Sequence, residues 1–115
     1  MNFTTGAALL DAIVLSVVSR EPDGTYGYKI TQEIKQALDL SESTLYPVLR
    51  RLQKDGCLTV YDSTANGRNR RYYMITEVGR ERLAAYRSDW RQYAASIDQL
   101  LEEDNYDSNR IYEVS

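Results

Sequence analysis

The chain of 115 residues has no histidine and a single cysteine, Cys57. These absences exclude an intrachain disulfide, a zinc site built from Cys and His ligands, and catalysis by a histidine base. The sequence also lacks a nucleotide-binding glycine loop and a nucleophile with an identifiable base. We therefore predict no catalytic residue, no metal and no cofactor, and we do not expect an enzyme. Cys57 begins the apolar run Cys-Leu-Thr-Val-Tyr, which indicates a buried side chain.

A long hydrophobic run is absent as well. Asp11 interrupts the apolar N-terminal segment, and its unbroken part, residues 12–19, is far shorter than the roughly 20 residues that cross a bilayer. No positively charged region precedes this segment, as it would in a signal peptide. We therefore expect a cytoplasmic protein with no membrane partner.

Positive charge is scarce overall, since the formal net charge is −3 and the pI is near 4.9. The distribution is uneven, however. Residues 41–75 contain six basic and three acidic residues, whereas residues 98–115 contain six acidic residues and one basic residue. A local basic patch is what attracts phosphate groups, so the acidic total does not exclude a nucleic-acid partner.

The first half of the chain predicts two helices. Residues 6–19 carry apolar side chains at helical spacing, at Leu9, Leu10, Ile13, Val14, Val17 and Val18. A turn with Pro22 and Gly24 follows. Residues 28–38 predict a second helix, with Ile30, Ile34 and Leu38 on one face.

A third helix is predicted to begin near Ser43, although both Ser41 and Ser43 are suitable N-caps. With this start, Pro47 lies in the first turn, where a missing N–H is tolerated. Gly56 is a suitable C-terminal stop. Leu45, Val48, Leu49 and Leu52 are expected to face the core, with Arg50, Arg51 and Lys54 on the other side.

A hairpin and a long helix complete the chain. Residues 58–61 and 71–75 are rich in β-forming residues, and Asn66-Gly67 is the expected apex of the turn between them. Thr76 is the expected cap of the last helix. That helix carries apolar residues at steps of 3, 4, 3, 4 and 3, at Leu83, Tyr86, Trp90, Tyr93, Ile97 and Leu100. This heptad pattern predicts packing on another helix, and we expect a homodimer interface there.

These elements predict a mainly α chain with a small β-hairpin (α+β), arranged as a winged helix-turn-helix. A basic hairpin directly after a compact helix favours DNA binding, with the helix in the major groove and the hairpin along the phosphates. The predicted contacts are Ser43, Thr44, Tyr46, Arg50 and Lys54 on the helix, and Arg68, Arg70 and Arg71 on the hairpin. The alternative is that Ser43 is only a cap, Tyr46 belongs to the core and the basic residues form a solvated face.

At this point the sequence resembles the PadR family of bacterial transcriptional regulators. The matching phrases are Tyr26-Gly27-Tyr28-Lys29-Ile30, Ser43 to Leu52 with Lys54-Asp55-Gly56, Arg70-Arg71-Tyr72-Tyr73 and Thr76-Glu77-Val78-Gly79. The resemblance covers roughly residues 8–102 and is closest to the small subfamily. It implies a dimeric repressor that binds a pseudo-palindromic double-stranded DNA operator.

The resemblance also extends to the multidrug-sensing branch, because Trp90 lies eleven residues after Gly79 as in that branch. This implies that a planar aromatic compound stacks on Trp90, with Tyr86 and Tyr93 beside it. The alternative is that Trp90 only packs in the seam. We divide the chain into a DNA-binding domain at 1–75, a dimerisation helix at 76–104 and an acidic flexible tail at 105–115. A winged-helix interaction module without DNA binding is the competing function.

Overall fold

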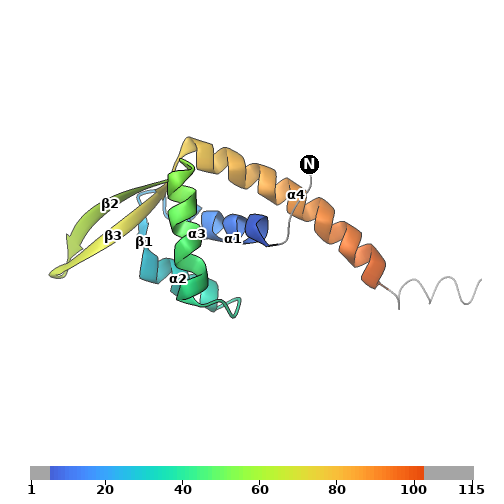
Figure 1. Cartoon of the computed structure of the whole chain (residues 1–115), viewed down its shortest axis with the longest axis horizontal. Helices are drawn as coiled ribbons and strands as arrows, with labels where there is room; N and C mark the ends of the chain where they lie inside the picture. Colours follow the sequence, from blue (N-terminus) through green and yellow to red (C-terminus); the bar gives the residue numbers. More distant parts are fainter. Residues whose placement is uncertain (1–5, 103–115) are drawn as a thin grey trace, which may run out of the picture.

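The computed structural model describes residues 6–102 and confirms the winged helix-turn-helix architecture with a long C-terminal helix. The predicted tail at 105–115 lies outside the described residues. Figure 1 shows the helical body, the projecting hairpin and the last helix. In chain order the elements are α1 (Ala7–Ser19), β1 (Thr25–Tyr26), α2 (Gly27–Lys35), α3 (Glu42–Lys54), β2 (Leu58–Ala65), β3 (Arg68–Ile75) and α4 (Glu77–Leu101).

The core forms where α1 packs against α2, α3 and α4. Val14, Leu15 and Val18 of α1 are fully buried there, because their helical spacing places them on one face. The four predicted core positions of α3 are also buried, which confirms that part of the pattern. Cys57, immediately before β2, is fully buried as predicted, and burial raises the pKa of its thiol.

The sheet has three antiparallel strands in the order β1-β3-β2. Asn66 and Gly67 form the turn of the hairpin, both with positive φ, at 53° and 75°. Two residues in this conformation match the twist of the flanking strands, so the predicted apex is confirmed. The strands are longer than predicted because cross-strand pairing continues from Leu58–Ile75 out to Ala65–Arg68. Strand β1 was not predicted, since two residues carry no detectable alternation.

Two helix boundaries differ from the prediction. Helix α2 ends at Lys35 rather than at residue 38, so the side chain of Leu38 is 44% exposed instead of joining the core. Helix α3 begins at Glu42, because the Ser41 hydroxyl accepts the N–H of Thr44 and makes Ser41 the N-cap. The start therefore lies one residue before the predicted position near Ser43, and Pro47 lies in the second turn, inside the helix, rather than in the first.

The ends of α3 and the start of α4 are tied together. Gly56 follows α3 with a φ of 80°, and the N–H groups of Gly56 and Cys57 reach back to the carbonyls of Gln53 and Leu52. This Schellman arrangement ends the helix where the sequence predicted. Thr76 caps α4 by accepting the N–H of Gly79, and its hydroxyl donates to the carbonyl of Gly56 at 2.6 Å. Thr76 thus links the C-terminal end of α3 to the N-terminal end of α4.

Helix α4 has 25 residues, and its C-terminal half extends beyond the other elements in Figure 1. Within residues 6–102, no helix combines the length and the apolar character that crossing a bilayer requires.

Candidate nucleic-acid interface

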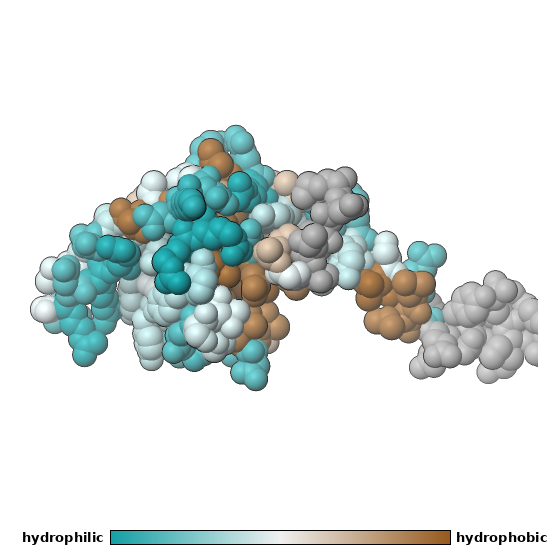
Figure 2. Space-filling view, in the orientation of Figure 1, coloured by the Kyte–Doolittle hydropathy of each residue, from teal (hydrophilic) through white to brown (hydrophobic). Residues whose placement is uncertain are grey.

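Helix α3 has one buried and one exposed face. Ser43, Thr44, Arg50 and Lys54 are exposed, on the side opposite the buried leucines and valine. A period of 3.6 residues brings these polar side chains to the same side of the helix. Figure 2 shows hydrophilic surface over α3 and the hairpin. The exposed face therefore offers two hydroxyls near its start and two cations further along.

Three hydroxyl groups gather at the N-terminus of α3. The Ser41 Oγ lies 2.9 Å from the Ser43 Oγ and 3.1 Å from the Thr44 Oγ1. Beside them, Lys35 of α2 pairs with Glu42, and this hydrogen bond raises the pKa of the lysine. The positive end of the helix dipole and the hydroxyl donors make this terminus suited to a phosphate oxygen.

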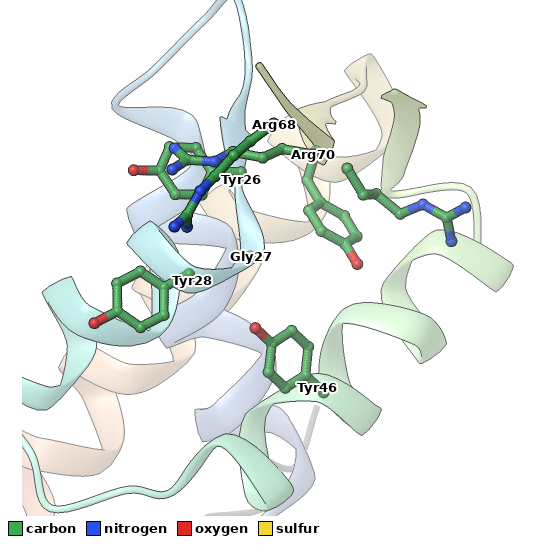
Figure 3. Close-up of a pocket in the computed structure, with 8 residues that line it drawn as sticks. Tyr26, Gly27, Tyr28, Tyr46, Arg68 and Arg70 are labelled. Atoms are coloured by element: carbon green, nitrogen blue, oxygen red, sulfur yellow. The ribbon is translucent and has the colours of Figure 1, made fainter. Parts of the chain in front are cut away.

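A groove of about 530 Å³ runs between the hairpin and the start of α2 and α3. We call it the wing groove; its lining residues are Tyr26, Gly27, Tyr28, Tyr46, Arg68, Arg70, Arg71 and Tyr73. Figure 3 shows tyrosine and arginine side chains from three parts of the chain surrounding it. Tyr46 packs so tightly on Gly27 that a Cβ there would lie 2.9 Å from its ring. Tyr46 is therefore half-buried, with one side lining the wing groove.

The three hairpin arginines have different surroundings. Arg68 is exposed beside the turn. The Arg70 guanidinium lies over the ring of Tyr26, 4.2 Å from its centroid, and the Arg71 Nε lies 3.4 Å from a carboxylate oxygen of Asp62. An exposed ion pair at that distance is weak and leaves Arg71 able to exchange partners. All three predicted arginines line the wing groove, although only Arg70 is held by an aromatic ring.

Tyrosines behind Arg70 support the hairpin. Tyr26, Tyr72 and Tyr61 occupy the same row of the three strands. The rings of Tyr61 and Tyr72 stack with centroids 5.2 Å apart, and Tyr26 meets Tyr72 edge-on at 5.7 Å. Such cross-strand aromatic pairs stiffen a hairpin that projects from its core. No pattern in the sequence groups these three tyrosines, and the strand register brings them together.

Arg51 lies at the border of the exposed face of α3 rather than fully on it, and its side chain is 40% exposed. Its guanidinium forms an ion pair with Asp11 of α1, whose side chain is only 7% exposed. The Tyr86 hydroxyl donates to the other carboxylate oxygen of Asp11 at 3.0 Å. A buried carboxylate needs such partners, and this pairing directs the Arg51 guanidinium toward α1. The one signal in the sequence was an aspartate inside an apolar run.

A second groove, of about 480 Å³, lies between α1, α2 and α4. We call it the Trp90 groove. Of the predicted ligand residues, Trp90 and Tyr86 line it, together with apolar residues such as Leu9, Ile13 and Leu38. Tyr93 is not among its lining residues, but its ring centroid lies 6.1 Å from that of Trp90. Burial and the nearby charge of Asp11 raise the pKa of Tyr86.

The predicted seam of α4 divides into two parts. Leu83 is buried within its own chain, and Tyr86 packs against the core. Toward the other end, Ile97 is half-buried, whereas Leu100 and Leu101 are 79% and 74% exposed. Figure 2 shows the apolar patch at the end of α4.

Comparison with known proteins shows which family shares this sequence and architecture. The model of the transcriptional regulator PadR-like family matches residues 14–85. Transcriptional regulator Rv3488 of Mycobacterium tuberculosis is 33% identical over 88 residues, which cover 75% of this chain and 82% of that protein. The crystal structure of smu.1704 from Streptococcus mutans superposes with a TM-score of 0.77 at 37% identity, covering 90% of this chain and 95% of that one.

A further crystal structure, the PadR-like transcriptional regulator BC4206 from Bacillus cereus, gives a TM-score of 0.74 at 28% identity. It covers 85% of this chain and 96% of the other. The matched residues include the whole of α2, α3 and the hairpin, and they extend into α4. The chain therefore belongs to the PadR-like family of transcriptional regulators.

Proposed function

We propose that this protein is a dimeric, sequence-specific DNA-binding repressor whose operator affinity changes when a planar aromatic molecule binds. The observation that carries the proposal is the surface made by the exposed face of α3 and the adjoining wing groove. Hydroxyl, guanidinium and ammonium groups concentrate there. These are the groups that hydrogen-bond phosphate oxygens and base edges.

In this proposal α3 lies in the major groove of double-stranded DNA. Arg50 is long enough to form a bidentate pair with guanine, and Lys54 contacts the backbone. Ser43 and Thr44 donate to a phosphate at the helix N-terminus, with Tyr46 beside them. Arg68, Arg70 and Arg71 hold the flanking strand along the hairpin.

The dimer is built on α4. Leu100, the last position of the seam that begins at Leu83, and its neighbour Leu101 form an exposed apolar patch at the end of the helix, which suits burial against a second copy. A two-fold axis through this helix would present two recognition helices to successive major grooves, which requires a pseudo-palindromic operator. Residues 1–75 are then the DNA-binding domain and residues 76–104 the dimerisation helix.

The ligand part of the proposal rests on the Trp90 groove. Its walls are mainly apolar and Trp90 is 42% exposed, so an aromatic ring can reach the indole. Tyr86 and Tyr93 complete the aromatic neighbourhood. Such a molecule lowers operator affinity only if it binds more tightly to a conformation with unsuitable spacing between the two recognition helices.

The test is binding to the DNA immediately upstream of the protein's own gene, compared with a scrambled duplex across a salt series. We expect a preference for the upstream duplex that persists near physiological salt, with affinity falling steeply as salt rises. Equal binding to both duplexes would contradict sequence-specific recognition. Absence of binding even at low salt would favour a protein-interaction module in its place.

A further inference from the structure

Asp11 joins three helices at a single carboxylate. It lies on the buried side of α1, where the neighbouring positions are apolar. Arg51 of α3 donates from Nη2 to its Oδ1, and Tyr86 of α4 donates its hydroxyl to Oδ2. Each oxygen of the carboxylate therefore has a donor from a different helix.

The two donors belong to two different surfaces. Arg51 follows Arg50 on α3, the helix that carries the proposed base contact. The ring of Tyr86 lines the Trp90 groove, one helical turn before Trp90 itself. Three side chains thus connect the wall of the Trp90 groove with the helix that we propose to read DNA.

Because Asp11 is buried, its hydrogen bonds to Arg51 and Tyr86 are costly to break. The Asp11 carboxyl group is 7% exposed, and it loses much of its stabilisation when one of its two donors leaves, because water has little access to replace that donor. A planar molecule that packs against the Tyr86 ring competes for the position from which the hydroxyl reaches Asp11. When the hydroxyl is displaced, Asp11 and Arg51 must change position. Because Arg51 belongs to α3, its movement alters the placement of that helix.

We propose that Asp11 is a positioning residue that couples occupancy of the Trp90 groove to the placement of the recognition helix α3. Its effect on DNA depends on the function proposed above, whereas the coupling itself is measurable without DNA. Because coupling between two sites is reciprocal, operator binding changes the affinity of the Trp90 groove by the same factor.

The experiment uses the full chain and the fluorescent probe 8-anilinonaphthalene-1-sulfonate. Trp90 is the only tryptophan, so energy transfer from it to the probe shows that the probe is bound in the neighbourhood of Trp90. Amide hydrogen exchange of α3, followed by NMR, reports the placement of that helix. We expect the bound probe to change exchange at residues 49–53 in the native chain.

The deciding variant is Tyr86→Phe, which keeps the ring in the wall of the groove and removes the hydroxyl. We expect it to bind the probe at least as tightly, because the probe no longer displaces a hydroxyl from Asp11, and to lose the exchange response in α3. Tyr93→Phe is the matched control, because it removes a hydroxyl from the same helix beside Trp90 and should keep the response. An α3 response that persists in Tyr86→Phe, or that is absent in the native chain with probe bound, overturns the proposal.

A parallel titration with operator DNA separates this inference from the function on which it rests. In the native chain the probe should lower operator affinity, and in Tyr86→Phe this loss should disappear. An exchange response without any DNA binding would retain the coupling and reject the repressor.

Discussion

The two ends of this molecule expose opposite chemistry. At the hairpin and α3, the surface is made of arginine, lysine, tyrosine and hydroxyl side chains, whereas the far end of α4 exposes leucines. Figure 2 shows this contrast, with hydrophilic surface over the hairpin and α3 and an apolar patch at the end of α4. The formal net charge of −3 for the whole chain indicates neither the basic surface at one end nor the apolar surface at the other.

The contrast teaches that a partner is selected by local surface chemistry. Cations that are close together create a local potential that attracts phosphates, even in an acidic chain. Clustered exposed leucines instead favour burial against another apolar surface. One end is therefore suited to nucleic acid and the other to a protein helix. Changes at either end should therefore affect different properties, namely DNA binding at the hairpin and α3 and self-association at the end of α4.

Removing the positive charge of the hairpin should have the largest effect. The triple variant Arg68→Ala, Arg70→Ala, Arg71→Ala should weaken operator binding by roughly 3–4 kcal/mol at low salt, since each arginine loses a charge-assisted phosphate contact. The slope of log affinity against log salt should fall by up to about 0.9 per lost contact. Fluorescence anisotropy of a labelled duplex measures both quantities.

A control with the same change in net charge is available on α4. Arg80, Arg87 and Arg91 are exposed on a helix that lines no part of the wing groove, and their replacement by alanine should leave most of the affinity intact. An equal loss in both triple variants would mean that net charge, and not its location, governs binding.

A charge introduced into the apolar patch at the end of α4 should weaken dimerisation. Leu100→Lys should weaken the dimer by about 1.5–3 kcal/mol, because a leucine that is buried between copies contributes about this amount. Sedimentation velocity over a concentration series measures the shift. Val78→Lys is the matched control, since Val78 is a half-exposed apolar residue at the opposite end of α4. A dimer that tolerates Leu100→Lys would exclude this patch from the interface.

A single change on α3 tests base recognition. Arg50→Ala should weaken specific binding by about 1–3 kcal/mol and leave binding to scrambled duplex nearly unchanged. Gln53→Ala alters another exposed side chain of the same helix and serves as the comparison. Equal weakening on both duplexes would assign Arg50 to the phosphates and remove its role in sequence recognition.

The pH dependence of stability should show the smallest effect. Burial raises the pKa of Cys57, Tyr73 and Tyr86 above their ordinary values of 9.0 for the thiol and 10.0 for the phenols. The folded chain therefore holds these protons more tightly than the unfolded chain. Stability is unaffected below about pH 9 and falls as pH rises further, because the unfolded state then loses its protons first.

Urea unfolding at a series of alkaline pH values measures this decline. Tyr73→Phe at the base of the hairpin and Tyr86→Phe on α4 should each make it shallower. Stability that rises with pH in this range would contradict the inferred burial of these groups. The variant with the shallower decline identifies which of the two buried phenols contributes more to the loss of stability.

Local chemistry allowed several elements to be predicted. The Asn66-Gly67 turn, the stop at Gly56 and the cap at Thr76 each depend on a few neighbouring residues and were confirmed. The start of α3 was predicted to within one residue, because two serines two residues apart are both good caps and the Ser41 hydroxyl is the one that accepts the N–H of Thr44.

Contacts between residues far apart in the chain could not be predicted from local sequence patterns. Strand β1 pairs only Thr25 and Tyr26 with Tyr73 and Tyr72, almost fifty residues later, and no alternation marks it. The row of stacked tyrosines depends on the same pairing. The exposure of Leu38 follows from the early end of α2, where a further turn of helix had been expected.

The sequence by itself determined the order of the elements, the buried face of α3, the basic hairpin and, through its motifs, the family. Helical periods, caps and turns are short-range properties, and the residues within a few positions specify them. Packing between helices brings Arg51 to Asp11, joins α1, α3 and α4 at that carboxylate, and places Trp90 beside a groove. The physical reason is that a buried charge takes its partners from whichever helices pack around it, however far apart they lie in the chain.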